Sequence, residues 1–396
     1  MRLQSPQFAH SPESVLLFLL CGLATLTWTG ETSASSVPDA RCGTVEPTAS
    51  EAQAIQLDLE QKSGGSAIQS GVGGIVRVAF HILHNGVDGN LTDAQIEAQM
   101  AELNLDFSGG AGGYDTGFRF VLASVDRTLN PDWFDMVQGS NNEKRCKEAL
   151  AVDPTHTVNI YTARFNALGW STFPWGVAES DVHQGMVVHY GSFPGGYITN
   201  FNMGRTVTHE MGHYFGLFHT FFTGCQEPND YVTDTPAEAA QTTGCPVDGT
   251  DTCPLPGVDP IHNFLDYSYD ACYAEFTPGQ DDRMDGMITT YKPHFITSAL
   301  GVSELPSQRI AMLRPVFPNP SGRRVTLSFA LRRESRVTLR VLDLTGRVVA
   351  RLVDGVLPAG NHERVFEAGS SSSGIYFVDL MAAGERASRR VVVTHE

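Results

Sequence analysis

The sequence predicts an α/β domain with an irregular, disulfide-bonded second half, followed by an all-β sandwich of the immunoglobulin-like kind. Between residues 75 and 215, segments with strand-like alternation are interspersed with segments of helical period. Four cysteines gather in the loop-rich stretch 225–272. Beyond residue 324, short runs of period-two alternation follow one another closely, which is typical of a sandwich.

The first part of the chain is expected to be leader sequence. The apolar run Val15–Trp28 follows a weakly basic start and precedes small residues, which is the layout of a secretory signal peptide, and it is too short to span a membrane comfortably. We assign residues 1–34 to this signal peptide and expect a secreted protein, free or attached to the cell surface. Residues 35–74 are rich in Ala, Ser and Gly and are expected to be a propeptide or linker without a packed core.

The α/β domain is assigned to residues 75–300. Residues 75–83 alternate well enough to form its first strand. Thr92 and Gln95 then make a capping box, so a helix is expected there, with a buried stripe formed by Ile96, Met100, Leu103 and Phe107. Further strands are predicted at 118–123, 158–161 and 185–190, and a second helix near Thr206. The strand around Val187 and Val188 is expected to be a sheet edge to which an extended peptide can add.

Composition changes after about residue 300. Pro315, Pro318 and Pro320 mark a stiff boundary, so a linker is assigned to 301–315 and the sandwich to 316–396. Its strands are predicted at 325–331, 337–341, 375–380 and 387–393.

The net charge argues against some classes of binding partner. The formal net charge is −17, which argues against nucleic acid and against anionic membrane surfaces. No other segment of the chain is apolar for long enough to span a membrane.

The most informative motif runs from His209 to His219. On a helix, residues four apart share a face, so His209 and His213 can bind one ion, and Glu210 lies next to them. Gly216 can take a left-handed conformation that ends the helix and lets His219 supply a third nitrogen. Three neutral nitrogens and an open position are what a catalytic Zn²⁺ requires. The motif predicts that Glu210 is a general base that accepts a proton from the attacking water and passes it to the leaving amine.

This spacing is the H-E-x-x-H-x-x-G-x-x-H motif of the metzincins, and residues 75–296 resemble the pappalysin family within that group. The resemblance is carried by Gly204–Glu210, His219–Phe221, Tyr231–Pro236, Gly244–Pro246 and Asn263–Ser268, with Cys272, Phe276, Thr277 and Gln280 behind them. It implies a metzincin-like catalytic domain and a secreted zinc endopeptidase that hydrolyses extracellular proteins or peptides. The rival functions are a catalytically weak binding or adhesion module, and a surface protein that acts through its sandwich.

The resemblance also assigns roles near the metal. Leu265 stands where the family has the methionine of its Met-turn, an apolar floor beneath the ligands, and leucine is close to methionine in volume. Tyr267 matches a tyrosine near the metal that can stabilise the oxyanion, and an ordinary packed tyrosine is the alternative. Asp270 lies in the segment that gives some members an acidic specificity pocket for basic residues, and a solvent-facing aspartate is the alternative.

The cysteines admit several arrangements. Spacing alone leaves three pairings open for Cys225, Cys245, Cys253 and Cys272, and a second metal site competes with them. The family pattern implies Cys225–Cys253 and Cys245–Cys272. Family members also bind calcium after the zinc helix, where Asp230, Thr233 and Thr235 offer oxygens to Ca²⁺, with an Asx-turn loop as the rival.

Cys42 lies in Arg41-Cys42-Gly43-Thr44, which resembles the short propeptides of some relatives. Its thiolate can fill the open zinc position and keep a zymogen latent. A disulfide to Cys146 and a free thiol are the alternatives.

The tail resembles sorting domains of the type IX secretion pathway. The matching stretches are 317–320, 341–347, 357–362 and 373–376. The resemblance implies export or anchoring through the secretion machinery or the cell surface, with a spacer or a carbohydrate-binding module as alternatives.

Overall fold

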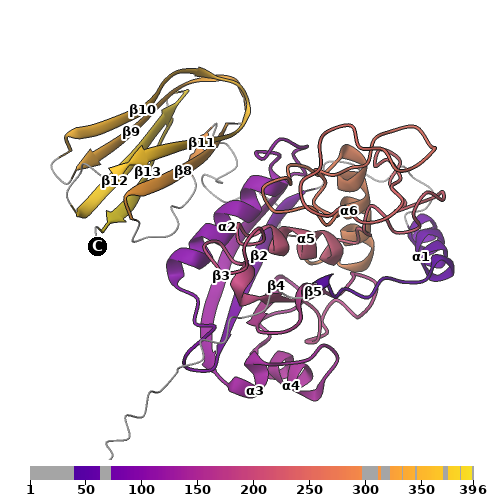
Figure 1. The fold of residues 1–396 in the computed structure, drawn as a ribbon. Coiled ribbons are helices and arrows are strands. Elements are labelled where there is room, and N and C mark those ends of the chain that lie inside the picture. Colours follow the sequence, from indigo (N-terminus) through magenta and orange to yellow (C-terminus); the bar gives the residue numbers. More distant parts are fainter. Residues whose placement is uncertain are drawn as a thin grey trace, which may run out of the picture. The chain divides into compact units, whose positions relative to one another are not determined.

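A computed structural model describes the chain over residues 40–62, 73–296, 311–313, 322–331, 333–343, 346–368, 373–383 and 385–394 (Figure 1). The predicted signal peptide, 1–34, lies outside these residues, as does most of the predicted linker. Within the described ranges, no helix combines the length and the apolar content that crossing a bilayer requires.

The α/β domain is built on one six-stranded sheet. In chain order its strands are β1 (Ala40–Cys42), β2 (Gly74–His84), β3 (Phe118–Leu129), β4 (Thr157–Ala163), β5 (Ala167–Ser171) and β6 (Met186–His189). Their order across the sheet is β1-β5-β6-β4-β2-β3, and only the β5–β6 pair is antiparallel. The predicted strands at 75–83, 118–123, 158–161 and 185–190 are confirmed.

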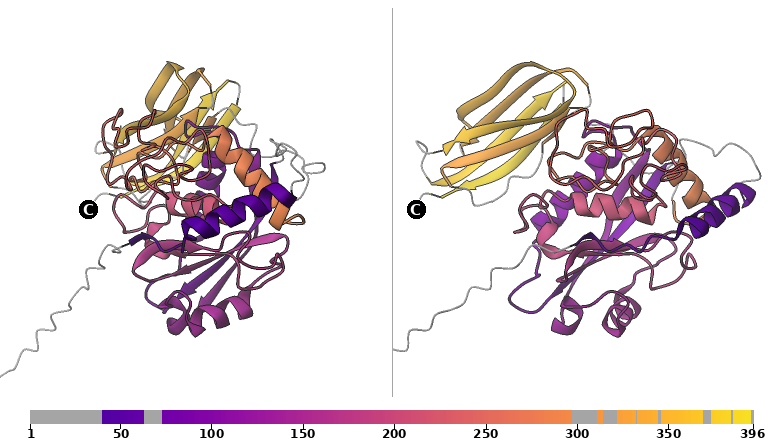
Figure 2. Two further views of the ribbon diagram at one scale, coloured as in Figure 1. Left: turned by 90° about the vertical axis from the view of Figure 1, so that its right-hand side faces the viewer. Right: turned by 45° about the vertical axis from the view of Figure 1, so that its right-hand side comes forward.

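Alternating side chains of the strands supply two separate cores. Val158 and Ile160 of β4 face a large cluster that also holds apolar residues of α2 (Asp93–Phe107), α5 (Arg205–Tyr214) and α6 (Pro278–Tyr291). Tyr161 and Ala163 face the other side, where α3 (Pro131–Phe134) and α4 (Asn141–Leu150) lie. Helix α2 has the predicted capping box, and its expected stripe is buried. The sheet therefore separates α5, the helix with the metal motif, from the small layer formed by α3 and α4 (Figure 2).

The prediction that Val187 and Val188 lie on a sheet edge is wrong. Strand β6 is hydrogen-bonded to β4 on one side and to β5 on the other. The next strand out is β5, and β1 covers it. Sequence alternation identifies a strand but not its neighbours, and β5 escaped prediction because Ala167–Ser171 is short and does not alternate.

The expectation that residues 35–74 have no packed core is wrong for residues 40–62. Strand β1 pairs with β5, and helix α1 (Ala49–Lys62) buries Ala52 and Leu59 completely. These two residues are seven positions apart, so they share one face of the helix. The segment is polar because only this narrow face is buried.

Between α5 and α6 the chain is irregular, as predicted. Two disulfides, Cys225–Cys253 and Cys245–Cys272, cross-link this part, and both implied pairings are confirmed. Cys42 and Cys146 are free thiols, so the alternative disulfide between them is excluded. Cys146 is a buried residue of α4 and packs in the core beneath that helix.

Gly216 ends the metal helix as predicted. Its φ is +97°, and Leu217 N donates to Gly212 O while Gly216 N donates to His213 O, which is a Schellman motif. A Cβ at Gly216 would lie 2.5 Å from Met287 Cγ on α6. The turn that returns His219 to the site therefore needs both the conformation and the small size of glycine.

The C-terminal part is a β-sandwich, as predicted. One sheet has the order β10-β9-β12-β13 and the other β11-β8-β7. The strands are β7 (Ala311–Leu313), β8 (Arg324–Leu331), β9 (Ser335–Asp343), β10 (Val348–Leu357), β11 (Gly360–Glu367), β12 (Gly374–Ala382) and β13 (Glu385–Val393). Strand β7 lies within the predicted linker, and β10 and β11 were not predicted. Much of β11 is polar and partly exposed, so it gives no clear alternation signal.

Gly216→Ala is expected to destabilise the domain more than Gly249→Ala. Both glycines have positive φ, but a Cβ at Gly249 meets nothing within 4 Å. The control variant Gly249→Ala should therefore lower the free energy of unfolding by about 1–2 kcal/mol, from backbone strain alone. Crowding against Met287 should add about 1–3 kcal/mol in Gly216→Ala. Denaturant unfolding of both variants measures the difference, and equal losses would contradict the packing argument.

Candidate active site

Three imidazoles converge beside helix α5. His209 and His213 lie on one face of the helix, and the turn at Gly216 brings back His219. His213 Nε2 lies 3.2 Å from His209 Nε2 and 3.1 Å from His219 Nε2. All three side chains are buried. The predicted ligands are thus brought together.

Backbone carbonyls fix which nitrogen of two rings faces the centre. His209 Nδ1 lies 2.7 Å from Phe264 O, and His213 Nδ1 lies 2.8 Å from Leu217 O. Because a carbonyl only accepts, each Nδ1 carries the proton and each Nε2 presents a lone pair. Burial and the neighbouring imidazoles lower the pKa of both rings well below the usual range, so they stay neutral.

This donor set fits a divalent metal ion. The Nε2 lone pairs of neighbouring rings face one another across 3.1–3.2 Å, and they repel one another unless they share a cation. Ligand nitrogens about 2.1 Å from a tetrahedral ion are about 3.4 Å apart, close to the observed spacing. The Sγ of Cys42 joins the three histidines, with all ligand atoms within 4.8 Å of one another. Within the described residues this is the one cluster of three or more His, Cys, Asp or Glu side chains whose ligand atoms lie close enough together to share an ion.

Glu210 lies fully buried beside the ligands. Its Oε2 accepts a 2.8 Å hydrogen bond from Thr44 Oγ1, and its Oε1 has no hydrogen-bond partner. Burial raises the pKa of Glu210 to about 8, although the Thr44 hydrogen bond opposes the rise. Strand β5 passes close by, since a Cβ at Gly169 would lie 2.7 Å from both Cγ and Oε1 of Glu210. The spacing motif gave no indication of Gly169.

Leu265 and Tyr267 lie where the resemblance implies. Leu265 is buried under the metal helix, where a Cβ at Gly212 would lie 2.8 Å from its Cδ2. The ring of Tyr267 is centred 5.0 Å from that of His219 and 5.8 Å from that of His209. Burial and the nearby Cys42 and Glu210 raise the pKa of Tyr267, so its hydroxyl stays protonated and able to donate.

Asp270 is buried, which excludes the solvent-facing alternative. Its Oδ2 accepts from Met203 N just before α5, and its Oδ1 has no hydrogen-bond partner. Burial raises the pKa of Asp270 to about 6, and the guanidinium of Arg41 opposes this.

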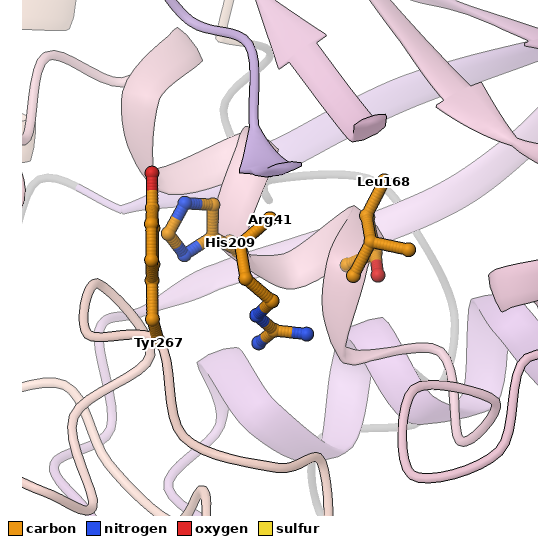
Figure 3. A pocket seen from close by; sticks show the side chains of 5 residues that line it. Arg41, Leu168, His209 and Tyr267 are labelled. Atoms are coloured by element: carbon orange, nitrogen blue, oxygen red, sulfur yellow. The ribbon is translucent and has the colours of Figure 1, made fainter. Parts of the chain in front are cut away.

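Arg41 lines a small pocket next to the metal ligands. The pocket is lined by Arg41, Leu168, Thr206, His209 and Tyr267 (Figure 3). The guanidinium lies 3.9 Å from the centre of the Phe201 ring and donates to Ser268 O and to Tyr273 Oη. A basic side chain from the N-terminal segment therefore lies within the electrostatic reach of Asp270.

The predicted calcium ligands form a hydrogen-bonded turn. Asp230 Oδ1 accepts from Val232 N, and both carboxylate oxygens accept from Thr235 Oγ1. Thr233 is exposed. The local geometry is that of the Asx-turn alternative.

Two family models match the chain. The one described as pregnancy-associated plasma protein-A matches residues 143–289, and the one described as a secretion system C-terminal sorting domain matches residues 315–394. An extracellular metalloprotease of Verticillium alfalfae is 40% identical over 63% of this chain and 89% of the relative. An extracellular metalloprotease of Pyricularia oryzae is 38% identical over 64% of this chain and 89% of the relative.

Two solved structures are similar in fold. Mature mirolysin of Tannerella forsythia in complex with a cleaved peptide has a TM-score of 0.50 and 26% identity, covering 57% of this chain and 96% of that one. A promirolysin mutant from the same organism has a TM-score of 0.55 and 23% identity, covering 65% and 97%.

Gly169→Ala is expected to lower kcat/KM by about 100-fold, because a Cβ would push the Glu210 carboxylate away from its position. The metal content should not change, since no histidine ligand is touched. Metal analysis together with kinetics on one peptide substrate measures both. Full activity in a folded variant would show that the approach of β5 does not constrain Glu210.

Proposed function

The chain belongs to the pappalysin family and is a secreted metallopeptidase, and we propose that it works as a zinc endopeptidase with Glu210 as its general base. The single observation that carries the proposal is the convergence of three imidazole Nε2 atoms beside a buried carboxylate. His209, His213 and His219 would hold the zinc. When bound, zinc supplies an activated water and polarises the scissile carbonyl.

Residues of the chain itself transfer the proton and stabilise the oxyanion. Glu210 accepts the proton of the attacking water and delivers it to the leaving amine. The Tyr267 hydroxyl donates to the developing oxyanion. A pure binding module has no use for Glu210, so this residue argues against the rival function of a binding or adhesion module.

An extended substrate adds to β5. Strand β1 already uses the outer edge of β5, with Cys42 opposite Gly169. Removing β1 frees main-chain donors and acceptors on that edge, to which a peptide can bind as a strand. Asp270 then favours a basic residue after the scissile bond. The position of Arg41 supports this, because a basic side chain of the N-terminal segment already lies within the electrostatic reach of Asp270.

Residues 35–74 act as a propeptide, with Cys42 as the zinc switch. The thiol lies among the three histidines and would take the open metal position. Residues 316–396 act as the sorting or anchoring domain, which the match over 315–394 supports. Calcium binding by Asp230, Thr233 and Thr235 stays a prediction.

Glu210→Gln is expected to keep one zinc per chain and to lose about 10²–10⁴-fold in kcat, because glutamine cannot accept the proton. Metal analysis after dialysis and cleavage of a protein substrate measure the two quantities. A chelator should silence the wild-type enzyme. Undiminished turnover of the zinc-loaded variant would refute the assigned base.

Asp270→Asn is expected to reduce the preference for Lys or Arg after the scissile bond by about tenfold or more, while cleavage before apolar residues changes little. Asparagine keeps an oxygen that can accept from Met203 N, so α5 should remain in place. Cleavage profiling of a peptide library with wild type and variant measures the change. An unchanged preference would assign Asp270 a structural role only.

A further inference from the structure

Strand β5 is held in the sheet by few main-chain contacts. On one side it pairs with β6 over Gly169, Trp170 and Ser171 only. Its other edge is the one to which a substrate adds in the proposed function. The same strand has to keep Gly169 against Glu210, where a Cβ would lie 2.7 Å from the carboxylate oxygen Oε1. A ladder of three residues that contains a glycine specifies register weakly, so this alignment depends on side chains as well.

The side chain of Trp170 makes a further contact on the opposite face of the sheet. Neighbouring residues of a strand point to opposite faces, so Trp170 points away from Glu210 while Gly169 lies against it. The Trp170 side chain packs in the buried cluster beneath α3 and α4. Its Nε1 donates to Oε1 of Glu143 at 3.0 Å. Because Glu143 belongs to α4, this hydrogen bond ties β5 to a helix on that face.

Three donors hold the carboxylate of Glu143. Besides the Trp170 indole, Lys147 Nζ lies 2.7 Å from its Oε1, and Gly139 N donates to its Oε2 at 2.6 Å. Burial raises the pKa of Glu143, but the Lys147 ammonium and the hydrogen bonds outweigh this, so the pKa is lowered and the carboxylate is ionised. Lys147 Nζ also donates to His183 O in the turn before β6. The carboxylate and its partners therefore join α4, β5 and the segment that leads into β6.

This polar group lies against a layer of mostly apolar side chains. A buried ion pair adds little stability over apolar residues of similar volume, because desolvation offsets the attraction. A buried network in which each charged group has partners specifies one geometry instead. The alignment of β5 is therefore a stronger reason for this arrangement than the stability of the domain.

We infer that Glu143 acts through Trp170 as a positioning residue, which holds β5 in the alignment that both Glu210 and a bound substrate strand require. The inference rests on the proposed function, because it concerns the strand to which the substrate adds. Glu143 lies across the sheet from α5, the helix that carries the base. Its effect on turnover passes through one hydrogen bond, which a single substitution removes.

The test compares Trp170→Phe with Trp133→Phe in the mature enzyme obtained from the full chain. Trp170→Phe keeps an aromatic ring but removes the donor to Glu143. Trp133 packs against the same cluster, and its side chain makes no hydrogen bond within the described residues. Trp170→Phe should raise KM for a peptide substrate by about fivefold or more and lower kcat, whereas Trp133→Phe should change both by less than about twofold. A loss of folded enzyme alone would lower kcat and leave KM unchanged.

Hydrogen exchange gives a readout that does not depend on activity. The amides of residues 167–171 should exchange at least about tenfold faster in Trp170→Phe than in Trp133→Phe, because β5 opens more readily without its contact to α4. The metal content of the two variants should be equal, since neither change touches a ligand.

Replacing the whole ion pair tests whether Glu143 acts through Trp170. Glu143→Leu combined with Lys147→Met leaves no unpaired charge, and apolar replacement of a buried pair is often neutral in stability. This variant should reproduce the rise in KM of Trp170→Phe. Adding Trp170→Phe to it should raise KM by less than about twofold further, because the hydrogen bond is already lost.

An unchanged KM in Trp170→Phe would overturn the inference, even if β5 exchanges faster. Unchanged exchange of β5 would also overturn it, as would effects on KM that multiply when the changes are combined. These failures differ from failure of the proposed function. If Glu210→Gln is inactive while Trp170→Phe behaves like Trp133→Phe, the enzyme assignment stands and the positioning role falls. If the Glu210→Gln enzyme is active, the assigned base falls, whatever β5 does.

Discussion

The site depends on two hydrogen bonds that orient imidazole rings. Phe264 O and Leu217 O accept the Nδ1 protons of His209 and His213 and thereby turn the Nε2 lone pairs of both rings to one point. These acceptors come from two different loops, one of which is the turn that ends α5. The loop 264–265 must therefore lie tightly under α5, and Gly212 allows Leu265 to approach. The ligand geometry is a property of the packing around the helix as much as of the motif on it.

In the proposed mechanism, one sheet edge connects latency to catalysis. Strand β5 places Gly169 against Glu210, and the same strand pairs with β1, which carries Cys42. A segment bound there reaches the metal ligands, the base and the pocket lined by Leu168, Thr206, His209 and Tyr267. In the proposed mechanism, substrate and propeptide compete for this edge, so the features that make the cleft able to bind an extended chain also make it easy to block.

The sequence motif predicted those parts of the site whose residues lie close together in the chain. The three histidines and Gly216 lie within eleven residues, and helix period and turn conformation alone place them. The contacts that complete the site are remote in sequence. Thr44 and Glu210 are 166 positions apart, and Arg41 and Ser268 are 227 apart. Nothing in the spacing of either segment encodes such a pairing. The wrong prediction that Val187 lies on a sheet edge has the same cause. The alternation of a strand does not show which other strands it pairs with, because the crossovers between strands decide their order.

The central claim is that three imidazole nitrogens hold one catalytic metal ion, and X-ray absorption spectroscopy tests it most directly. The latent full chain and the mature enzyme should each carry one zinc with imidazole ligands. A sulfur neighbour should be present in the latent form and replaced by oxygen after maturation. A purified protein without stoichiometric metal, or a metal shell without imidazole nitrogen, would contradict the account.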